Sequence, residues 1–482
     1  MKIIKNFIHN EYVDAVSGKT LDNFNPATGK VYSQMVRSGE ADVQTAVASA
    51  EKAFPLWSTS SRNDRSDMLM QIGALLQKRV QVFAEAESID QGKPVSLALK
   101  VDMARAVKNF EFFAHAILHE KENCSKLDGV GLNYSLRSPV GVAGLISPWN
   151  LPLYLLTWKV APALAVGNTA ICKPSELTPM TAYMFSQVLK DVGLPPGVCN
   201  IIFGLGSEAG AAIVKHPKIP IISFTGGTQT AESIIKDSAP HFKKLGLELG
   251  GKNPNIIFND CDLSKTVDVS VKSSFNNQGE ICLCGSRIFV QKEIYPKFIK
   301  DFIEKTEALI VGDPWDAQTF MGALVSKEHR DKVMSYINLA ESEGGKLISG
   351  GKVPVSIKGT DFENGYFIEP TIIEAQNIQC RLLQEEVFGP VVTITQFTDE
   401  DEVISWANST KYGLSASVWT QDITRAHSVA ERIKSGTVWI NSWMIRDLRV
   451  PFGGMKASGM GREGGSHSID FYTELKNVFV SY

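Results

Sequence analysis

Apolar runs of strand length alternate with amphipathic stretches between residues 139 and 251. The apolar runs cover residues 140–146, 169–172, 198–203, 219–224 and 245–249. Helical spacing of apolar residues marks the intervening stretches 178–192, 208–215 and 228–238. Continuous apolar strands that alternate with helices are typical of a parallel sheet covered on both faces. The pattern therefore predicts an α/β domain whose ligands bind at the carboxyl ends of the strands.

A second alternating block follows and predicts a second α/β domain. Its candidate strands are residues 255–258, 287–291, 391–397, 415–419 and 437–440. The first part of the chain predicts a surface strand pair around the turn 25–30, followed by mostly helical structure from about 40 to 116. The segments 118–137 and 477–482 fit no βα unit. Each could be an extended arm that pairs with another subunit or an edge strand of its own domain.

Composition excludes several classes of function. A chain of 482 residues with 44% hydrophobic content is too long for one simple core, so two or three domains are expected. A net charge of -3 offers no basic field for nucleic acid. No apolar run has bilayer length, the N-terminus lacks a signal-peptide core, and seven scattered cysteines argue against a disulfide framework or a zinc site. We expect a cytoplasmic protein without a bound metal.

Three residues could carry chemistry. Cys282 lies in the glycine-flanked segment 277–287, and a thiolate is a strong nucleophile towards carbonyl carbon. Glu248 precedes a pair of glycines and could act as a general base. Asn150 lies in a Pro-Trp-Asn-Leu-Pro segment and could donate a hydrogen bond. Taken singly, a cysteine is more often a core residue, a glutamate a surface residue and an asparagine before Leu-Pro part of a turn.

The order of motifs along nearly the whole chain resembles the aldehyde dehydrogenase superfamily. The motifs lie at residues 25–29, 148–152, 173–176, 224–226, 247–252, 277–287, 385–390 and 451–454. The resemblance implies that Cys282 attacks an aldehyde, that Glu248 activates the water that releases the acid, and that Asn150 stabilises the oxyanion together with the Cys282 N–H. Burial beside Leu247 and Leu249 would raise the pKa of Glu248. Cys284 stands where the family usually has a small residue, and we expect it to pack.

The resemblance also implies an NAD cofactor. A glycine-rich stretch, 204–210, is one residue longer than the standard dinucleotide fingerprint and is weak evidence by itself. A carboxylate at Glu176 repels a 2′-phosphate, which favours NAD over NADP. Gly227 and Ala231 depart from the family's usual serine and glycine, although both are small. The residues implied in cofactor binding are Ile146, Ser147, Trp149, Lys173, Glu176, Gly206, Phe224, Gly226, Gly227, Leu249, Glu386 and Phe388.

The implied architecture is an α/β fold with three parts. These are a Rossmann-type NAD-binding domain (1–117 and 141–250), an α/β catalytic domain (251–450) and a small β oligomerisation arm and tail (118–140 and 468–482). Family analogy suggests a homodimer or homotetramer.

Two arginines predict the substrate class. Arg446 lies in the segment 443–452, which should line a mostly apolar substrate funnel, and Arg105 on a predicted helix could face the same funnel. Guanidinium binds carboxylate through two hydrogen bonds, so a semialdehyde that also carries a carboxylate is expected. Each arginine could instead form a surface ion pair. Rival hypotheses are a general aldehyde dehydrogenase, a CoA-dependent relative and a catalytically silent scaffold protein.

Overall fold

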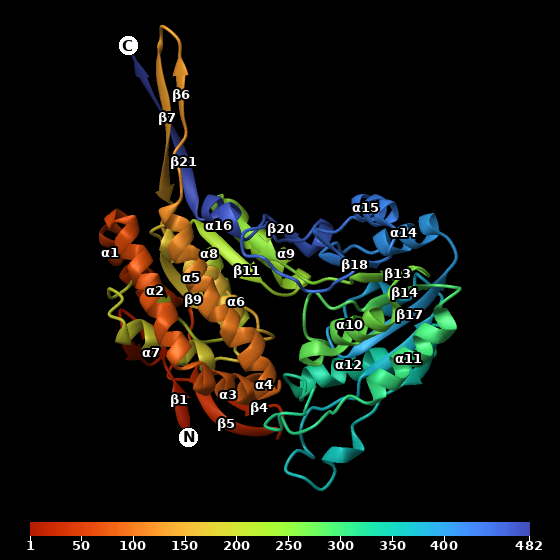
Figure 1. Ribbon diagram of the computed structural model, residues 1–482. Helices are drawn as coiled ribbons and strands as arrows, with labels where there is room; N and C mark the ends of the chain where they lie inside the picture. The colour runs from red at the N-terminus through yellow and green to blue at the C-terminus, as the bar shows by residue number, and fades with distance from the viewer.

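A computed structural model describes residues 1–482 and contains two α/β parts and a projecting arm (Figure 1). The first part is built on an eight-stranded sheet. Its central strands are parallel and match the five apolar runs predicted from the sequence. In sheet order the strands are β20 (Gly459–Met460), β12 (Lys244–Glu248), β11 (Ile221–Thr225), β8 (Val142–Ile146), β9 (Thr169–Lys173), β10 (Cys199–Ile201), β2 (Asn6–Ile8) and β3 (Glu11–Val13).

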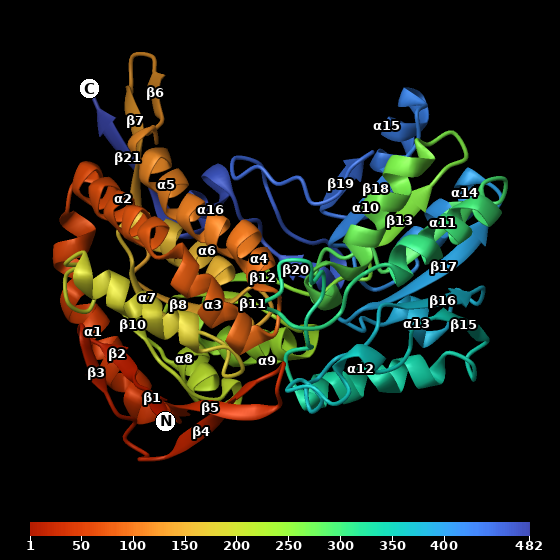
Figure 2. The same cartoon turned by 60° about the horizontal axis from the view of Figure 1, so that its bottom comes forward.

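Helices cover both faces of this sheet, which explains why its central strands β8, β9 and β11 are mostly apolar and buried. Neighbouring residues of β8 face opposite cores: Leu145 belongs to one hydrophobic cluster and Ile146 to another. One face is covered by α2 (Arg62–Lys78), α3 (Val80–Gln91), α5 (Ala104–Leu118), α6 (Pro152–Ala165) and α7 (Met180–Asp191), several of which lie together in Figure 2. The other face is covered by α1 (Glu40–Thr59), α8 (Ala211–Lys215) and α9 (Thr228–Ser238).

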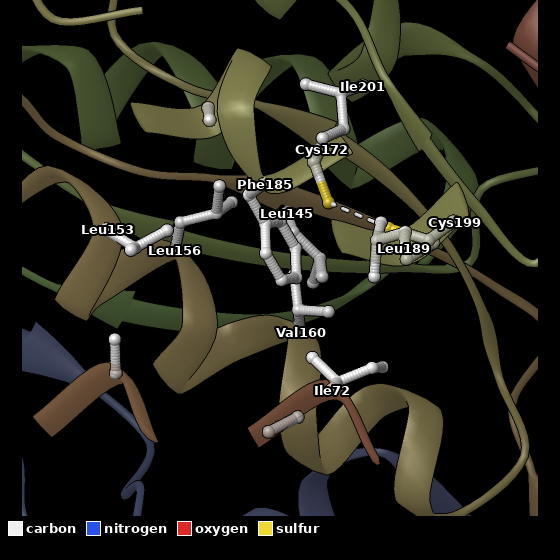
Figure 3. Close-up of a cluster of buried hydrophobic side chains, with 14 of the residues drawn as sticks. Ile72, Leu145, Leu153, Leu156, Val160, Cys172, Phe185, Leu189, Cys199 and Ile201 are labelled. Carbon is white, nitrogen blue, oxygen red and sulfur yellow. Dashed lines mark hydrogen bonds between the residues drawn. The ribbon is translucent and has the colours of Figure 1, made fainter. Parts of the chain in front are cut away.

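The core on the first face contains two cysteines from adjacent strands. Cys172 of β9 and Cys199 of β10 have their sulfur atoms 3.8 Å apart, and Phe185 of α7 lies in the same cluster (Figure 3). Both thiols are fully buried, and all seven cysteines of the chain are unpaired. These two cysteines therefore act as small core residues.

The second part is built on a seven-stranded sheet, again with helices on both faces. Its strands in order are β15 (Gly345–Ser349), β16 (Thr371–Ala375), β17 (Val391–Phe397), β14 (Arg287–Gln291), β13 (Pro254–Ile257), β18 (Ser415–Trp419) and β19 (Thr437–Ile440). The sequence predicted the last five and missed β15 and β16. The helices are α10 (Leu263–Phe275), α11 (Tyr295–Glu307), α12 (Lys327–Leu339), α13 (Arg381–Gln384), α14 (Glu400–Asn408) and α15 (Ile423–Arg432).

The arm is a separate three-stranded sheet of β6 (Cys124–Leu127), β7 (Gly131–Pro139) and β21 (Thr473–Ser481). β21 pairs with β7 along its whole length, from Thr473↔Pro139 to Ser481↔Gly131. The segments 118–137 and 477–482, which the sequence assigned either to an arm or to an edge strand, thus pair with each other away from both large sheets (Figure 1). The tail predicted from residue 468 begins as the end of helix α16 (Gly465–Phe471), and its strand starts at Thr473.

The N-terminal residues add a small sheet of β1 (Lys2–Ile4), β5 (Lys30–Val36) and β4 (Thr20–Asn25). The turn predicted at residues 25–30 joins β4 to β5. Short elements complete the chain: α4 (Val95–Leu97), the π-helical turns η1 (Ala98–Met103) and η2 (Gly206–Gly210), and the 3-10 turns η3 (Ala239–His241), η4 (Asn276–Gly279), η5 (Val355–Ile357) and η6 (Lys456–Ser458). None of the helices combines the length and apolar character needed to cross a bilayer.

Candidate active site

A cavity of about 290 Å³ is lined by residues from both α/β parts. Glu248 is the last residue of β12, and Asn150 lies in the loop between β8 and α6. Cys282 lies between η4 and β14 in the second part. All three line the cavity. The two α/β parts therefore bring together the three residues that the sequence singled out for chemistry.

Both the side chain and the backbone carbonyl of Asn150 are fixed by hydrogen bonds. Its side-chain Nδ2 donates to the Glu280 carbonyl at 2.8 Å, and its own carbonyl accepts from Asn277 Nδ2 at 3.2 Å and Lys93 Nζ at 2.9 Å. An amide nitrogen carries two protons, so one N–H of the side chain remains available to the cavity. Asn277 has a left-handed backbone (φ 52°), a strained conformation of the kind that clusters at functional sites.

The Cys282 thiol is half-buried, and its surroundings disfavour the charged thiolate. Burial raises its pKa, the carboxylates of Glu386 and Glu248 raise it further, and the guanidinium of Arg446 opposes them. The resting thiol is therefore protonated, and a nearby base is needed to produce the nucleophilic thiolate.

Cys284 does not share this environment. It packs in a hydrophobic cluster with Ile281, Leu283, Leu414 and Trp439, and it does not line the cavity. Burial raises the pKa of its thiol to about 12. The packing role expected from the sequence is the one that the structure gives Cys284.

Glu248 has the properties of a base that can deprotonate the Cys282 thiol. Burial raises its pKa well above the ordinary value, as expected, and the charge of Glu463 adds to the effect. Its Oε2 has no hydrogen-bond partner and is free to accept a proton. A Cβ on Gly453, where φ is +155°, would lie 2.8 Å from Glu248 Oε1, so a glycine there leaves room for the carboxylate.

The sequence missed two charged residues next to this base. Lys159 Nζ lies 3.2 Å from Glu463 Oε1 and 2.9 Å from Ser223 Oγ, and Trp158 Nε1 donates to Glu463 Oε2 at 2.6 Å. Glu463 lines the cavity. Glu463 and Lys159 place opposite charges near Glu248, and both act on its pKa. A signal for Lys159 existed, because it is the lone charge in the otherwise apolar helix α6.

A second cavity of about 720 Å³ lies at the carboxyl ends of β8, β9 and β11. Lys173 Nζ lies 2.6 Å from Glu176 Oε2 in its wall. Gly227 precedes α9, and a Cβ there would meet nothing within 4 Å, which leaves the helix N-terminus accessible to phosphate. Nine residues predicted to bind the cofactor line this cavity: Ile146, Ser147, Trp149, Lys173, Glu176, Gly206, Phe224, Gly226 and Gly227.

The other three predicted cofactor residues, Leu249, Glu386 and Phe388, line the cavity that contains Cys282. Glu386 Oε1 accepts from the Gly251 N–H at 2.9 Å, and a Cβ on Gly250 would lie 2.0 Å from its Oε2. Trp149 lines both cavities and meets the Phe388 ring edge-on at 5.3 Å. The sequence missed His329 and Lys332 of α12 in the same wall.

The two predicted substrate arginines differ in position. Arg446 lines the Cys282 cavity, its guanidinium lies 3.5 Å from the centre of the Phe452 ring, and it forms no ion pair. Arg105 does not line the cavity; it lies 5.4 Å from the ring of Tyr154, which does. Arg449 is exposed and paired with Asp447 at 2.6 Å. Arg446 and Lys332 are thus both cations of the cavity wall that form no ion pair.

A thiol, a buried carboxylate and an amide donor around one cavity can add the thiol to an aldehyde and, with a bound hydride acceptor to oxidise the adduct, hydrolyse the resulting thioester. The model of the aldehyde dehydrogenase family matches residues 12–478. The 2-aminomuconic semialdehyde dehydrogenase of Danio rerio is 51% identical over 100% of this chain and 98% of its own. The 2-hydroxymuconic semialdehyde dehydrogenase of Pseudomonas sp. (strain CF600) is 43% identical over 100% of both chains.

A solved structure gives the same assignment. The NAD+ complex of an aldehyde dehydrogenase from Bacillus cereus superposes with a TM-score of 0.96 at 38% identity, covering 100% of this chain and 97% of that one. The protein described here is therefore a member of the aldehyde dehydrogenase family.

Proposed function

We propose that the protein oxidises 2-aminomuconic 6-semialdehyde to 2-aminomuconate with NAD+ in the cytoplasm, as a step of the kynurenine branch of tryptophan catabolism. The Danio rerio relative named for this substrate supports the choice. The observation that carries it is Arg446, a cation without a carboxylate partner in the wall of the Cys282 cavity. A substrate with an aldehyde at one end and a carboxylate at the other supplies that partner.

The reaction begins when Glu248 takes the proton of the Cys282 thiol. The thiolate sulfur bonds to the aldehyde carbon, and the oxygen becomes an oxyanion that Asn150 Nδ2 stabilises. A nicotinamide held by Phe388 and Trp149 would accept the hydride from this carbon, which would leave a thioester on Cys282. Glu248 passes the thiol proton to solvent and is ionised again. It then takes a proton from water, the hydroxide adds to the thioester, and the Cys282 thiolate leaves as the acid forms.

The cavities fit an NAD+ molecule. The larger cavity has room before α9 for a pyrophosphate, and Lys173 and Glu176 in its wall can bind the hydroxyls of the adenosine ribose. Glu386 can bind the second ribose, and Phe388 and Trp149 can hold the ring beside Cys282. The carboxylate of Glu176 disfavours the extra phosphate of NADP+.

2-Hydroxymuconic semialdehyde is the second candidate substrate, because a relative named for it also matches the whole chain. The two compounds differ in one substituent and share the aldehyde and the carboxylate. The higher identity of the 2-aminomuconic relative favours the amino compound.

We also propose that the arm joins subunits into a homodimer or homotetramer. Its strands and the turn between β6 and β7 expose large apolar side chains that a monomer would leave in water. These are Leu127, Val130, Leu136, Leu475, Phe479 and Val480.

A substrate panel tests the proposal. kcat/KM for NADH formation is measured with both muconic semialdehydes and with an uncharged aldehyde of similar length. Arg446→Ala should lower kcat/KM for the muconic semialdehydes about tenfold to a hundredfold more than for the uncharged aldehyde, the worth of one charge-assisted contact. The loss with the uncharged aldehyde measures the effect of Arg446 on Cys282 and Glu248. Arg449→Ala removes a neighbouring exposed arginine and is the matched control. Equal losses for charged and uncharged substrates, or higher wild-type kcat/KM for the uncharged aldehyde, would point to a general aldehyde dehydrogenase.

A further inference from the structure

Lys93 is a fully buried lysine directly behind the residue that we propose stabilises the oxyanion. It lies in the loop between α3 and α4, and its side chain is 0% exposed. Its Nζ donates to the Asn150 carbonyl at 2.9 Å and to Asp102 Oδ1 at 3.0 Å, and it lies 3.7 Å from Glu87 Oε1. A buried ammonium that contacts an active-site backbone is expensive to retain unless it is fully paired.

The cluster of Lys93, Glu87 and Asp102 has no net charge when the two carboxyl groups share one proton. Glu87 and Asp102 are both fully buried beside a single ammonium. Burial raises the pKa of Glu87 and the charge of Asp102 raises it further, so Glu87 is the carboxyl that keeps a proton. Glu87 Oε1 and Asp102 Oδ2 otherwise have no hydrogen-bond partner, and one proton donated from Glu87 to Asp102 satisfies both. One ammonium and one carboxylate remain, without net charge.

The protein fixes every member of this cluster. Glu87 Oε2 accepts from the Leu153 N–H in the first turn of α6 at 3.2 Å, and Asp102 belongs to the π-helical turn η1, a local irregularity that is often found at functional sites. Gly92, next to Lys93, has a φ of +94°, and a Cβ there would lie 2.5 Å from the Ala323 carbonyl of the second α/β part. The ammonium is therefore held at a fixed point.

We propose that Lys93 is a positioning residue for oxyanion stabilisation: its ammonium, held by Asp102, fixes the peptide group of Asn150 and so aims the Asn150 amide at the aldehyde oxygen. The inference rests on the proposed role of Asn150. The Asn150 carbonyl has two donors, Lys93 and Asn277, and its side chain has one anchor, the Glu280 carbonyl. Lys93 supplies the only charged contact of the three. Transition-state donors need placement to within a fraction of an ångström, so loosening this peptide costs rate.

The test removes the ammonium without leaving a buried charge unpaired. In the double variant Lys93→Met/Asp102→Asn, Glu87 stays protonated and the cluster stays neutral. We expect kcat to fall about tenfold to a hundredfold, with an unchanged dissociation constant for NAD+ and an unchanged KM for the aldehyde. Asp102→Asn alone keeps the ammonium, because Glu87 can then ionise in place of Asp102, and it should lose less activity than the double variant. If the double variant does not fold, Lys93→Gln/Asp102→Asn keeps a polar group in the space.

The same changes made in an Asn150→Ala background show whether Lys93 acts through Asn150. If it does, the double variant lowers kcat in the wild type but has little further effect in Asn150→Ala, because the group that it positions is gone. An equal loss in both backgrounds, or no loss in the wild type, would overturn the role of Lys93. If Asn150→Ala itself keeps full activity, the proposed role of Asn150 fails instead, so the two failures are distinguishable.

Discussion

Burial is the main cause of the raised pKa of Glu248, and opposing charges that can be removed one at a time adjust it. Glu463 raises it, whereas Lys159 lowers it, and the two form a pair at 3.2 Å beside the cavity. Glu463→Gln removes the negative charge and leaves Lys159 unpaired, and both changes lower the Glu248 pKa. Lys159→Met removes the positive charge and leaves Glu463 unpaired, and both changes raise it. The two variants should therefore shift the same pKa in opposite directions.

The size of each shift follows from the Coulomb energy. Two unit charges about 4 Å apart interact with about 4 kcal/mol at an effective dielectric constant of about 20, and the energy falls with distance. Glu248 forms no hydrogen bond to Glu463 or Lys159. The interaction energy of Glu248 with either Glu463 or Lys159 is therefore about 1–2 kcal/mol, which corresponds to about one pKa unit.

The assay is the decay rate of the acyl-enzyme, measured as a function of pH after rapid mixing. Glu248 works as a base only when it is ionised, so the rate falls on the acid side through its pKa. We expect this fall to move about one pH unit lower in Glu463→Gln and about one unit higher in Lys159→Met. Glu474→Gln on the exposed arm changes the net charge by the same amount and should leave the profile unchanged. Shifts in the same direction for both variants, or none for either, would refute this account of the base.

Three further predictions concern packing, stability and cofactor choice. Cys284→Ser should keep kcat within about threefold of wild type in the NADH assay, because Cys284 lies outside the cavity, and a loss comparable to that of Cys282→Ser would contradict this. Phe185→Ala should lower the free energy of unfolding by about 3–5 kcal/mol in urea denaturation, because the ring is fully buried (Figure 3), and a loss below about 1 kcal/mol would show that the core collapses around the gap. Glu176→Gln should raise kcat/KM for NADP+ relative to NAD+, and an unchanged ratio would mean that other groups select the cofactor.

The sequence predicted most of the fold because strands buried on both faces leave an unmistakable apolar pattern. β14, β17, β18 and β19 begin and end where the sequence predicted. β15 was missed because Gly345–Ser349 contains no buried residue, and so it lacks that pattern. β16 is an apolar run as long as β14, but no α-helix separates it from β15 along the chain, so no alternation of strand and helix marked it.

The site was only partly predictable. Cys282, Glu248 and Asn150 stand in motifs that the family resemblance identifies, and they meet at one cavity. Glu463 and Lys93 carry no local signal, because their significance arises from contacts with residues far along the chain. Lys93 contacts Asn150, which lies 57 residues away in the sequence, and Glu463 contacts Lys159, which lies 304 residues away. Only the packed structure shows such contacts.

The central claim is that Cys282 carries the substrate as a thioester. The thioester should be present during the first turnover of the wild-type protein, before water releases it; Glu248→Gln would remove the base for the thiol as well as the base for water. Rapid quenching of the wild-type protein during its first turnover with NAD+ and semialdehyde, followed by peptide mass spectrometry, should show the acyl group on Cys282. An acyl group on Cys284 instead, or NADH formation without any acylated cysteine, would contradict the account.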